Sequence, residues 1–253
     1  MRPVTADNLR RQVAEFYQRE AIAREYVSQR YSGASGEGVA RRELAIAAGF
    51  LPQDGRILDV ACGTGRLGNV LGASQTLVGV DTSEAMLQQA RAGGRYAELV
   101  QGDAFALPFP DDSFDAAISL RLLFHFPDPL PILAELARVT RPGGVVVFET
   151  ASWSPRAGRA WAAADWGPKV FVHKAEMIRD RLSAAGLRPT RGVDAFLISP
   201  YLYRRLPPFG VFMLERLESH LPTRFRCRSY WQAAVGGARG SEVASIGKQE
   251  FEA

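Results

Sequence analysis

The stretch DVACGTGRLG at residues 59–68 combines a carboxylate with closely spaced glycines. Gly63, Gly65 and Gly68 follow the G-x-G-x-x-G spacing of a dinucleotide-binding turn. Glycine lets a ligand approach the backbone closely, because it has no side chain. The stretch therefore predicts a ligand-binding loop, and the surrounding residues must decide which ligand it takes.

Three acidic residues narrow the choice. Asp59 stands directly before the glycines, where it would repel a pyrophosphate and would favour a cationic ligand such as S-adenosylmethionine, which has no phosphate. Asp81 is placed to accept hydrogen bonds from ribose hydroxyls, which suits both cofactor classes. Asp103 could accept from an adenine amino group. We therefore predict an adenosine cofactor without pyrophosphate.

Short apolar runs and helical patterns alternate around these residues. We predict strands at 57–61, 76–81, 97–103, 114–120 and 143–150, and helices at 66–73, from Ser83 onward and at 130–140. Runs that are apolar on both faces are typical of a parallel sheet covered by helices. Because ligands of such doubly wound sheets bind beyond the carboxyl ends of the strands, the glycine loop is expected there.

The flanking regions are less regular. We predict a helical pattern over 7–30, a loop over 31–38 and a helix over 39–49. After residue 150 we predict a helix at 173–186, a strand at 193–199, a helix at 207–221 and a strand at 224–235. The aromatic stretch 196–217 is predicted to be core or a dimer contact, with a surface that touches lipid-like substrates as the alternative.

Composition sets broad limits on function. The chain has 253 residues, of which 47% are hydrophobic, and a formal net charge of +4. Two cysteines give neither a disulfide framework nor a cysteine zinc site, and we expect no metal. We see no apolar run long enough to span a membrane, no signal peptide and no dense basic run for nucleic acid. We expect a cytoplasmic enzyme, with a homodimer as one expected assembly.

Four ordered motifs carry a family resemblance. They are ILDVACGTGRLG, VGVDTSEAMLQQA, GDAFALPFPDDSFDAAISLRLLFHFPDP and ELARVTRPGGVVVFE. Together they resemble class I S-adenosylmethionine-dependent methyltransferases, of the small-molecule type that includes the ubiquinone and menaquinone biosynthesis methyltransferases. The resemblance implies an α/β, Rossmann-like, seven-stranded and mostly parallel sheet, with an antiparallel strand near the C-terminus and helices on both faces. Ala61 departs from the family's first glycine, a mild change.

The resemblance also implies a domain plan. Residues 1–38 would form an N-terminal helical lid, and 39–235 the methyltransferase domain. That domain would divide into a cofactor half at 39–150 and a substrate-side half at 151–235, followed by a tail at 236–253.

The family's motifs imply roles for individual residues. The methionine end of the cofactor would be lined by Asp59, Ala61, Gly63 and Gly65. The ribose and adenine would be held by Asp81, Thr82, Met86, Asp103 and Ala104. The sulfonium would be bordered by Ser119 and Arg121. A lid tyrosine, Tyr17, Tyr26 or Tyr31, would cap the methionine.

Some residues have a structural interpretation as well as a functional one. His125 is a candidate general base because its pKa lies near neutrality, but it is also interpreted as a structural histidine. Gly68 is interpreted as a packing residue, and Cys62 as a buried thiol rather than a nucleophile. Trp153, Trp161 and Trp166 would wall a substrate pocket or cover the sheet edge.

The prediction is a methyltransferase that transfers a methyl group by in-line displacement to a small molecule, and we expect that molecule to be anionic or aromatic. The other hypotheses are an NAD-dependent oxidoreductase, a non-catalytic binding protein of the same fold, and an RNA or protein methyltransferase. The sequence does not distinguish oxygen, carbon and nitrogen acceptors.

Overall fold

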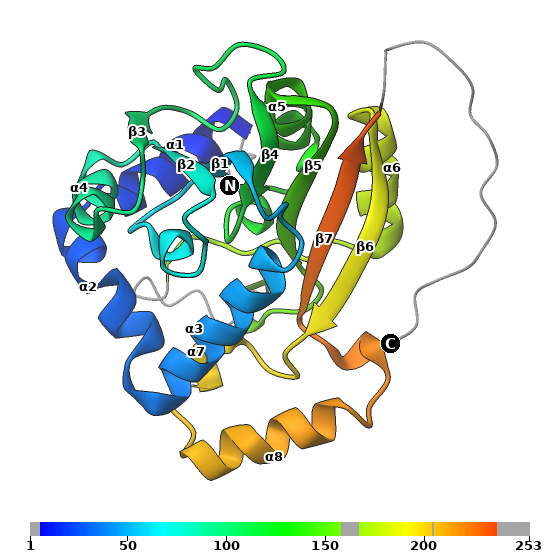
Figure 1. Cartoon of the computed structure of the whole chain (residues 1–253). Helices are drawn as coiled ribbons and strands as arrows, with labels where there is room; N and C mark the ends of the chain where they lie inside the picture. The colour runs from blue at the N-terminus through cyan, green and yellow to red at the C-terminus, as the bar shows by residue number, and fades with distance from the viewer. Residues whose placement is uncertain (1–5, 158–166, 204, 237–253) are drawn as a thin grey trace.

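The computed structural model describes residues 6–157, 167–203 and 205–236, which form a seven-stranded sheet covered by helices (Figure 1). The strand order is β3-β2-β1-β4-β5-β7-β6. The strands are β1 Gly55–Val60, β2 Gln75–Asp81, β3 Glu98–Gln101, β4 Phe114–Ser119, β5 Thr140–Ala151, β6 Leu187–Ala195 and β7 Arg228–Val235.

Strand direction confirms the predicted fold class. The pairs from β3 across to β5 are parallel, whereas β7 is antiparallel to both β5 and β6. The last four residues of β1 and the last five of β2 are buried, as expected for strands covered on both faces. The strand order reverses at β1, which places the ligand edge next to the glycine loop.

Helices cover both faces of this sheet. The α-helices are α1 Ala6–Tyr17, α2 Glu20–Tyr31, α3 Gly33–Ala48, α4 Glu84–Gly93, α5 Leu130–Val139, α6 Ala175–Ala184, α7 Pro200–Tyr203 and α8 Pro208–Glu218. Short 3-10 turns lie at Arg66–Asn69, Leu123–His125, Pro155–Ala157 and Thr223–Phe225. One apolar cluster joins α1, α5 and α6 to the sheet, and another joins α3, α7 and α8 to it. The core therefore lies in two layers, one on each face.

Local sequence explains where the cofactor-half elements begin. Ser83 caps α4, because its hydroxyl accepts a hydrogen bond from the Met86 N–H at 3.2 Å.

Gly68 lies where an added Cβ would stand 2.6 Å from the Arg95 side chain, which confirms its interpretation as a packing residue. Cys62 is buried, and burial raises the pKa of its thiol well above the usual value. This agrees with the interpretation of Cys62 as an inert thiol.

Three local predictions are wrong. The helix predicted at 66–73 is only a 3-10 turn at Arg66–Asn69. The loop predicted over 31–38 is mostly helical, since α3 begins at Gly33, directly after the extended Ser32. Gly36 allows this sharp junction, because a Cβ there would stand 2.6 Å from the Tyr31 carbonyl carbon. The strand predicted at 193–199 is instead Leu187–Ala195, an edge strand with many exposed residues and therefore a weak apolar pattern.

Some further predictions concern membrane spans, the C-terminal tail and the tryptophans. Within the described residues, no helix is long and apolar enough to cross a bilayer. The predicted tail beyond residue 236, and Trp161 and Trp166, lie outside the described residues. Trp153 is described and is half exposed.

Candidate functional site

The glycine loop turns sharply because several of its residues adopt left-handed backbone angles. Ala61, Gly63 and Gly65 have φ values of 58°, 55° and 79°. At Ala61 this conformation costs about 1–2 kcal/mol, because its Cβ crowds the carbonyl that follows. A Cβ at Gly65 would stand 3.0 Å from Ala90, whereas one at Gly63 would meet no atom within 4 Å. Gly65 thus keeps the turn tight, and Gly63 faces open space.

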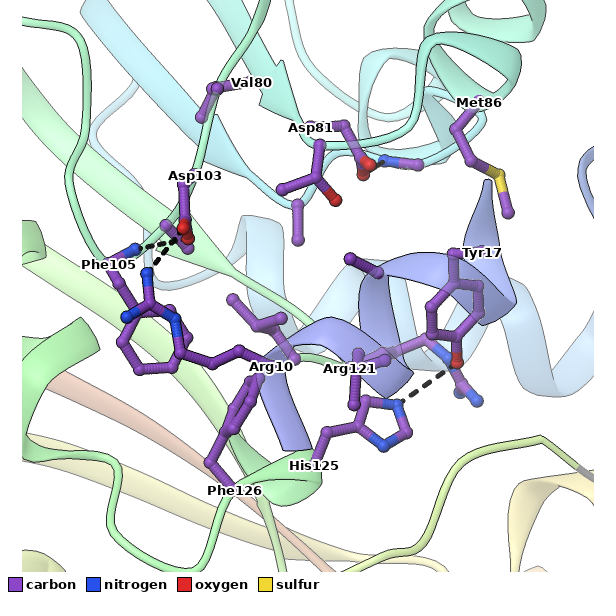
Figure 2. A pocket seen from close by; sticks show the side chains of 18 of the residues that line it. Arg10, Tyr17, Val80, Asp81, Met86, Asp103, Phe105, Arg121, His125 and Phe126 are labelled. Atoms are coloured by element: carbon purple, nitrogen blue, oxygen red, sulfur yellow. Dashed lines mark hydrogen bonds and ion pairs between the residues drawn. The ribbon is translucent and has the colours of Figure 1, made fainter. Parts of the chain in front are cut away.

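A cavity of about 250 Å³, called here the main cavity, opens beside this loop at the carboxyl ends of the parallel strands (Figure 2). Its wall combines α1, the end of β2, and the segments that follow β1, β3 and β4. Eight of the predicted cofactor residues line it: Ala61, Gly63, Asp81, Thr82, Met86, Asp103, Ala104 and Arg121.

Asp81 is held rigidly at the end of β2. One carboxylate oxygen accepts the Gly63 N–H at 2.9 Å, and the other accepts the Ser83 N–H at 2.8 Å. Burial raises the pKa of Asp81, and these backbone donors act in the opposite direction. Each carboxylate oxygen has further acceptor capacity, so Asp81 can still accept a hydroxyl.

Asp103 is paired with the N-terminal helix. Arg10 donates to one oxygen of Asp103 at 2.6 Å, and the Phe105 N–H donates to the other at 2.9 Å. The Arg10 guanidinium also lies over the Phe105 ring, 4.1 Å from its centroid. Figure 2 shows these three residues together at one end of the cavity. α1 is therefore attached to the cofactor half by a charged contact.

A smaller hollow of about 50 Å³, called here the charged pocket, continues from the main cavity. The two share Tyr26, Ala61, Gly63, Leu120 and Arg121. The charged pocket adds these polar residues: Asp59, Thr64 and Arg66.

Asp59 is the acid of the charged pocket. It is 4% exposed and accepts a hydrogen bond from the Tyr96 hydroxyl at 2.6 Å. Burial raises the pKa of Asp59 to about 7; the Tyr96 hydrogen bond lowers it and the Asp81 charge adds to the rise. A cation bound beside Asp59 would restore its ionised form.

The arginines of the charged pocket converge on a fully buried glutamate. Glu43 lies 2.7 Å from Arg66 and 3.2 Å from Arg121. Although burial acts to raise it, these two arginines hold the pKa of Glu43 at about 2. The charged pocket thus combines one acid, Asp59, with two guanidinium groups that share a buried carboxylate.

Three predicted cofactor residues do not line either hollow: Gly65, Ser119 and Tyr31. The Ser119 hydroxyl donates to the Val60 carbonyl oxygen at 3.0 Å, and so joins two strands. The Tyr31 hydroxyl donates to Glu43 at 3.2 Å and accepts from Arg66 at 2.6 Å. Tyr31 therefore orients the arginine cluster, while Tyr17 and Tyr26 are the tyrosines that reach the main cavity.

His125 lies in the wall of the main cavity, on the side away from Asp81 (Figure 2). Its Nδ1 is 3.0 Å from the Lys169 carbonyl oxygen, so Nδ1 carries the proton, and Nε2 accepts from the Tyr17 hydroxyl at 3.2 Å. Burial, together with the Arg156 charge, lowers the pKa of His125 to about 3. The imidazole is therefore a neutral acceptor near pH 7.

Helix α1 contributes residues to the main cavity that the sequence motifs did not predict, apart from Tyr17. Arg10, Val13, Ala14 and Tyr17 all face the main cavity. Their spacing of three, four and seven residues marks one side of a helix. This stripe is visible in the sequence, but only the structure shows what it covers.

Comparisons with known proteins agree with this geometry. A family model described as "Methyltransferase domain" matches residues 58–148. The demethylmenaquinone methyltransferase of Mycobacterium sp. (strain KMS) is 35% identical over 225 residues, which are 81% of this chain and 94% of that protein.

Solved structures show the same fold. The magnesium protoporphyrin IX methyltransferase ChlM of Synechocystis PCC 6803, solved with bound SAH, has a TM-score of 0.63 at 17% identity, over 89% of this chain and 99% of that one. The [4+2]-cyclase SpnF has a TM-score of 0.64 at 21% identity, over 90% and 97% of the two chains. Because one neighbour is named a cyclase, the fold alone does not define the reaction.

The fold, the motifs and these relatives together define a class I S-adenosylmethionine-dependent methyltransferase. Within that class, the chain belongs to the menaquinone and ubiquinone type. It is a methyltransferase of small molecules, and the oxidoreductase, non-catalytic and macromolecule-modifying hypotheses are not favoured.

Proposed function

We propose that this chain binds S-adenosylmethionine across the two joined hollows and methylates a quinol-like aromatic ring. One observation carries the first part: Asp59 and the Arg66–Arg121 cluster lie in one small pocket that continues into the main cavity. An acid and two guanidinium groups suit the ammonium and carboxylate of an amino acid. A dinucleotide would bring phosphates to the same acid.

Two features of the residues fit such a ligand. Within the described residues, the Thr64 hydroxyl oxygen is buried and has no hydrogen-bond partner. It lies in the charged pocket, where a polar group of the amino-acid end would satisfy it. Gly63 leaves open space where the ligand would pass from one hollow to the other.

The main cavity would take the adenosine. Asp81 would accept from the ribose hydroxyls, and Met86 and Thr82 would lie against the base. Asp103 and Ala104 would meet the adenine edge, with Arg10 sharing the carboxylate. Ser119, Gly65 and Tyr31 would act indirectly, by holding the strands, the loop turn and the arginines.

When bound, the methyl donor supplies a methyl carbon activated by a positive sulfur. The protein's own task is to hold the acceptor in line with the methyl–sulfur bond and to exclude water, and such orientation contributes up to about 7–11 kcal/mol. Tyr17 and Tyr26 from the N-terminal helices line the main cavity, where they would help to exclude water.

His125 would hold the acceptor hydroxyl. Its Nε2 is an acceptor and lies in the cavity wall, where the hydroxyl of the methyl acceptor would replace the Tyr17 hydroxyl. With a pKa of about 3, the imidazole would polarise that hydroxyl as a hydrogen-bond acceptor more than remove its proton outright. His125 is in this sense our candidate catalytic residue.

The aromatic acceptor is supported by two points. Relatives that span most of this chain are named demethylmenaquinone methyltransferases. The cavity also presents Tyr17 and Phe126 beside His125, and such rings pack well on a flat aromatic ligand.

Transfer of a radiolabelled methyl group tests this function. The substrate would be a short-chain demethylmenaquinol, with catechol and a simple amine as comparison acceptors. We expect label in the extracted quinol product and little in the others. Binding of S-adenosylmethionine without label transfer to the quinol would contradict the acceptor class, while absence of cofactor binding would contradict the whole proposal.

A further inference from the structure

Helix α8 carries an exposed apolar face that the site does not use. Phe209 is 72% exposed, and Phe212, Met213 and Leu217 are each about half exposed. These four residues, the α8 apolar face, are spaced three, four and eight positions from the first, and so lie on one side of the helix. They are exposed and so are not core, which was one of the two favoured predictions for this stretch; the dimer contact stays a prediction. Exposed aromatic residues gathered in this way mark an interaction surface.

The opposite side of α8 is fixed to the protein. Val211 and Glu218 are buried. Glu218 accepts two hydrogen bonds from Arg42 of α3, at 3.0 and 2.6 Å, and one from the Phe196 N–H at 3.2 Å. The apolar face is therefore held outward by a buried charged anchor.

Charge around this face is mainly basic. In the described stretch 205–225, the exposed ionised residues comprise three arginines (Arg205, Arg216 and Arg224) and one glutamate, Glu215. The Arg224 guanidinium lies 5.1 Å from the ring centroid of Phe225, which is itself half exposed. Aromatic residues interleaved with arginines suit the interface of an anionic membrane.

The face also lies at the functional edge of the sheet. Arg228 at the start of β7 pairs with Ala195 at the end of β6 and with Ala151 at the end of β5. The segment between β6 and β7 thus projects beyond the carboxyl ends of the parallel strands, the edge that also holds the main cavity. Figure 1 shows α8 at the bottom of the molecule, below the ends of β5 and β6.

We propose that the α8 apolar face docks on an anionic lipid surface. A second copy of the chain is the less suitable occupant, because a two-fold interface would place the arginines of one face against those of the other. Docking would bring the cavity edge to the bilayer, and its use for a lipid-borne acceptor rests on the function proposed above.

Vesicle co-sedimentation of the full chain tests the docking. The probes are vesicles of phosphatidylcholine alone and vesicles with about 30% phosphatidylglycerol. We expect binding to the anionic vesicles, and at least a tenfold weaker partition for Phe209→Ser/Phe212→Ser. The matched control, Val27→Ser/Val70→Ser, changes exposed aliphatic residues elsewhere and should bind like wild type. Arg216→Gln should weaken binding to the vesicles that contain phosphatidylglycerol by about fivefold.

Companion measurements on the same preparations separate the alternatives. Equal vesicle binding by wild type and the phenylalanine variant, or no binding by either, would overturn the proposal. A wild-type dimer that the same variant converts to a monomer in sedimentation equilibrium would also overturn it, in favour of self-association. Calorimetry with S-adenosylmethionine should give equal affinity for both proteins; if wild type binds vesicles but no cofactor, docking stands and the proposed function fails.

Discussion

The charged pocket and the main cavity are neighbours, yet they are built in different ways. The charged pocket takes most of its polar groups from one local stretch, since Asp59, Thr64 and Arg66 lie within eight residues of one another. The main cavity joins α1 to distant loops: Arg10 reaches Asp103 across 93 residues, and Tyr17 reaches His125 across 108. The loop residues of the charged pocket are therefore encoded locally, while the main cavity depends on tertiary packing.

The largest effect is expected where the two hollows meet. Gly63→Val should weaken S-adenosylmethionine binding at least about 100-fold, because the side chain would fill open space used by the ligand. Gly94→Val is the matched control: Gly94 also has a left-handed φ, 62°, and open space, but caps α4 outside both hollows. If the two variants lose similar stability but only Gly63→Val loses affinity for S-adenosylmethionine, the position of Gly63 against the ligand is supported. Equal affinities of the two variants would contradict it.

A smaller loss is expected in the main cavity. Asp81→Asn keeps the shape of the side chain but removes the charge that would hold the ribose hydroxyls. Hydrogen bonds to charged groups contribute about 1.5–3 kcal/mol, so affinity should fall roughly 10- to 150-fold by calorimetry. Unchanged affinity would show that Asp81 only holds the backbone of Gly63 and Ser83.

The charged pocket should respond to pH. Asp59 has a pKa raised to about 7 by burial, so it is neutral below that value and cannot attract an ammonium. Affinity for S-adenosylmethionine should fall up to about tenfold per pH unit as the pH decreases below about 7, with proton release on binding. Asp59→Asn should bind weakly and show no such dependence between about pH 5.5 and 7. A wild-type affinity that is flat over this range would contradict the pairing.

The same raised pKa affects stability. Because Asp59 binds its proton more tightly folded than unfolded, its contribution is present below about pH 4 and is lost as the pH rises through about 7. Asp59→Asn should therefore be relatively more stable at pH 8 than at pH 4, compared with wild type, in urea denaturation without ligand.

The smallest effect is expected on the acceptor side. His125→Phe should lower kcat about tenfold with little change in cofactor affinity, because it keeps a ring but removes the Nε2 hydrogen-bond acceptor. Since burial lowers the pKa of His125 to about 3, the wild-type kcat profile should show no histidine inflection near pH 6.5. An inflection there that is absent from the variant would show that His125 is solvated and titrates as an ordinary base.

This comparison also explains how far the sequence could predict the molecule. The parallel strands and the glycine turn were predictable because apolar runs and left-handed glycines are local signals. Ala61 illustrates the limit: its residue type hides the left-handed angle that it adopts. The beginning of α3 was missed because the glycines and serines at 32–38 are typical of a loop. Tertiary contacts stabilise the helix there; for example, the Ser35 hydroxyl donates to the Leu206 carbonyl oxygen at 2.8 Å.

The site residues divide in the same way. The family resemblance predicted the acids of the loop edge and eight of the residues that line the main cavity. It gave Tyr31 a position against the ligand, whereas a buried cluster with Glu43 and Arg66 holds that side chain. Charge networks of this kind join α2, α3 and the loop, and no linear spacing encodes them.

The most direct test of the donor site is a calorimetric comparison of S-adenosylmethionine with methylthioadenosine, which lacks the amino-acid end. The proposed site predicts micromolar binding of the first and at least about 100-fold weaker binding of the second, because only the first reaches the charged pocket. In Asp59→Asn the difference between the two ligands should shrink. Equal affinities for the two ligands in the wild type, or tighter binding of NADH than of either, would contradict the central claim.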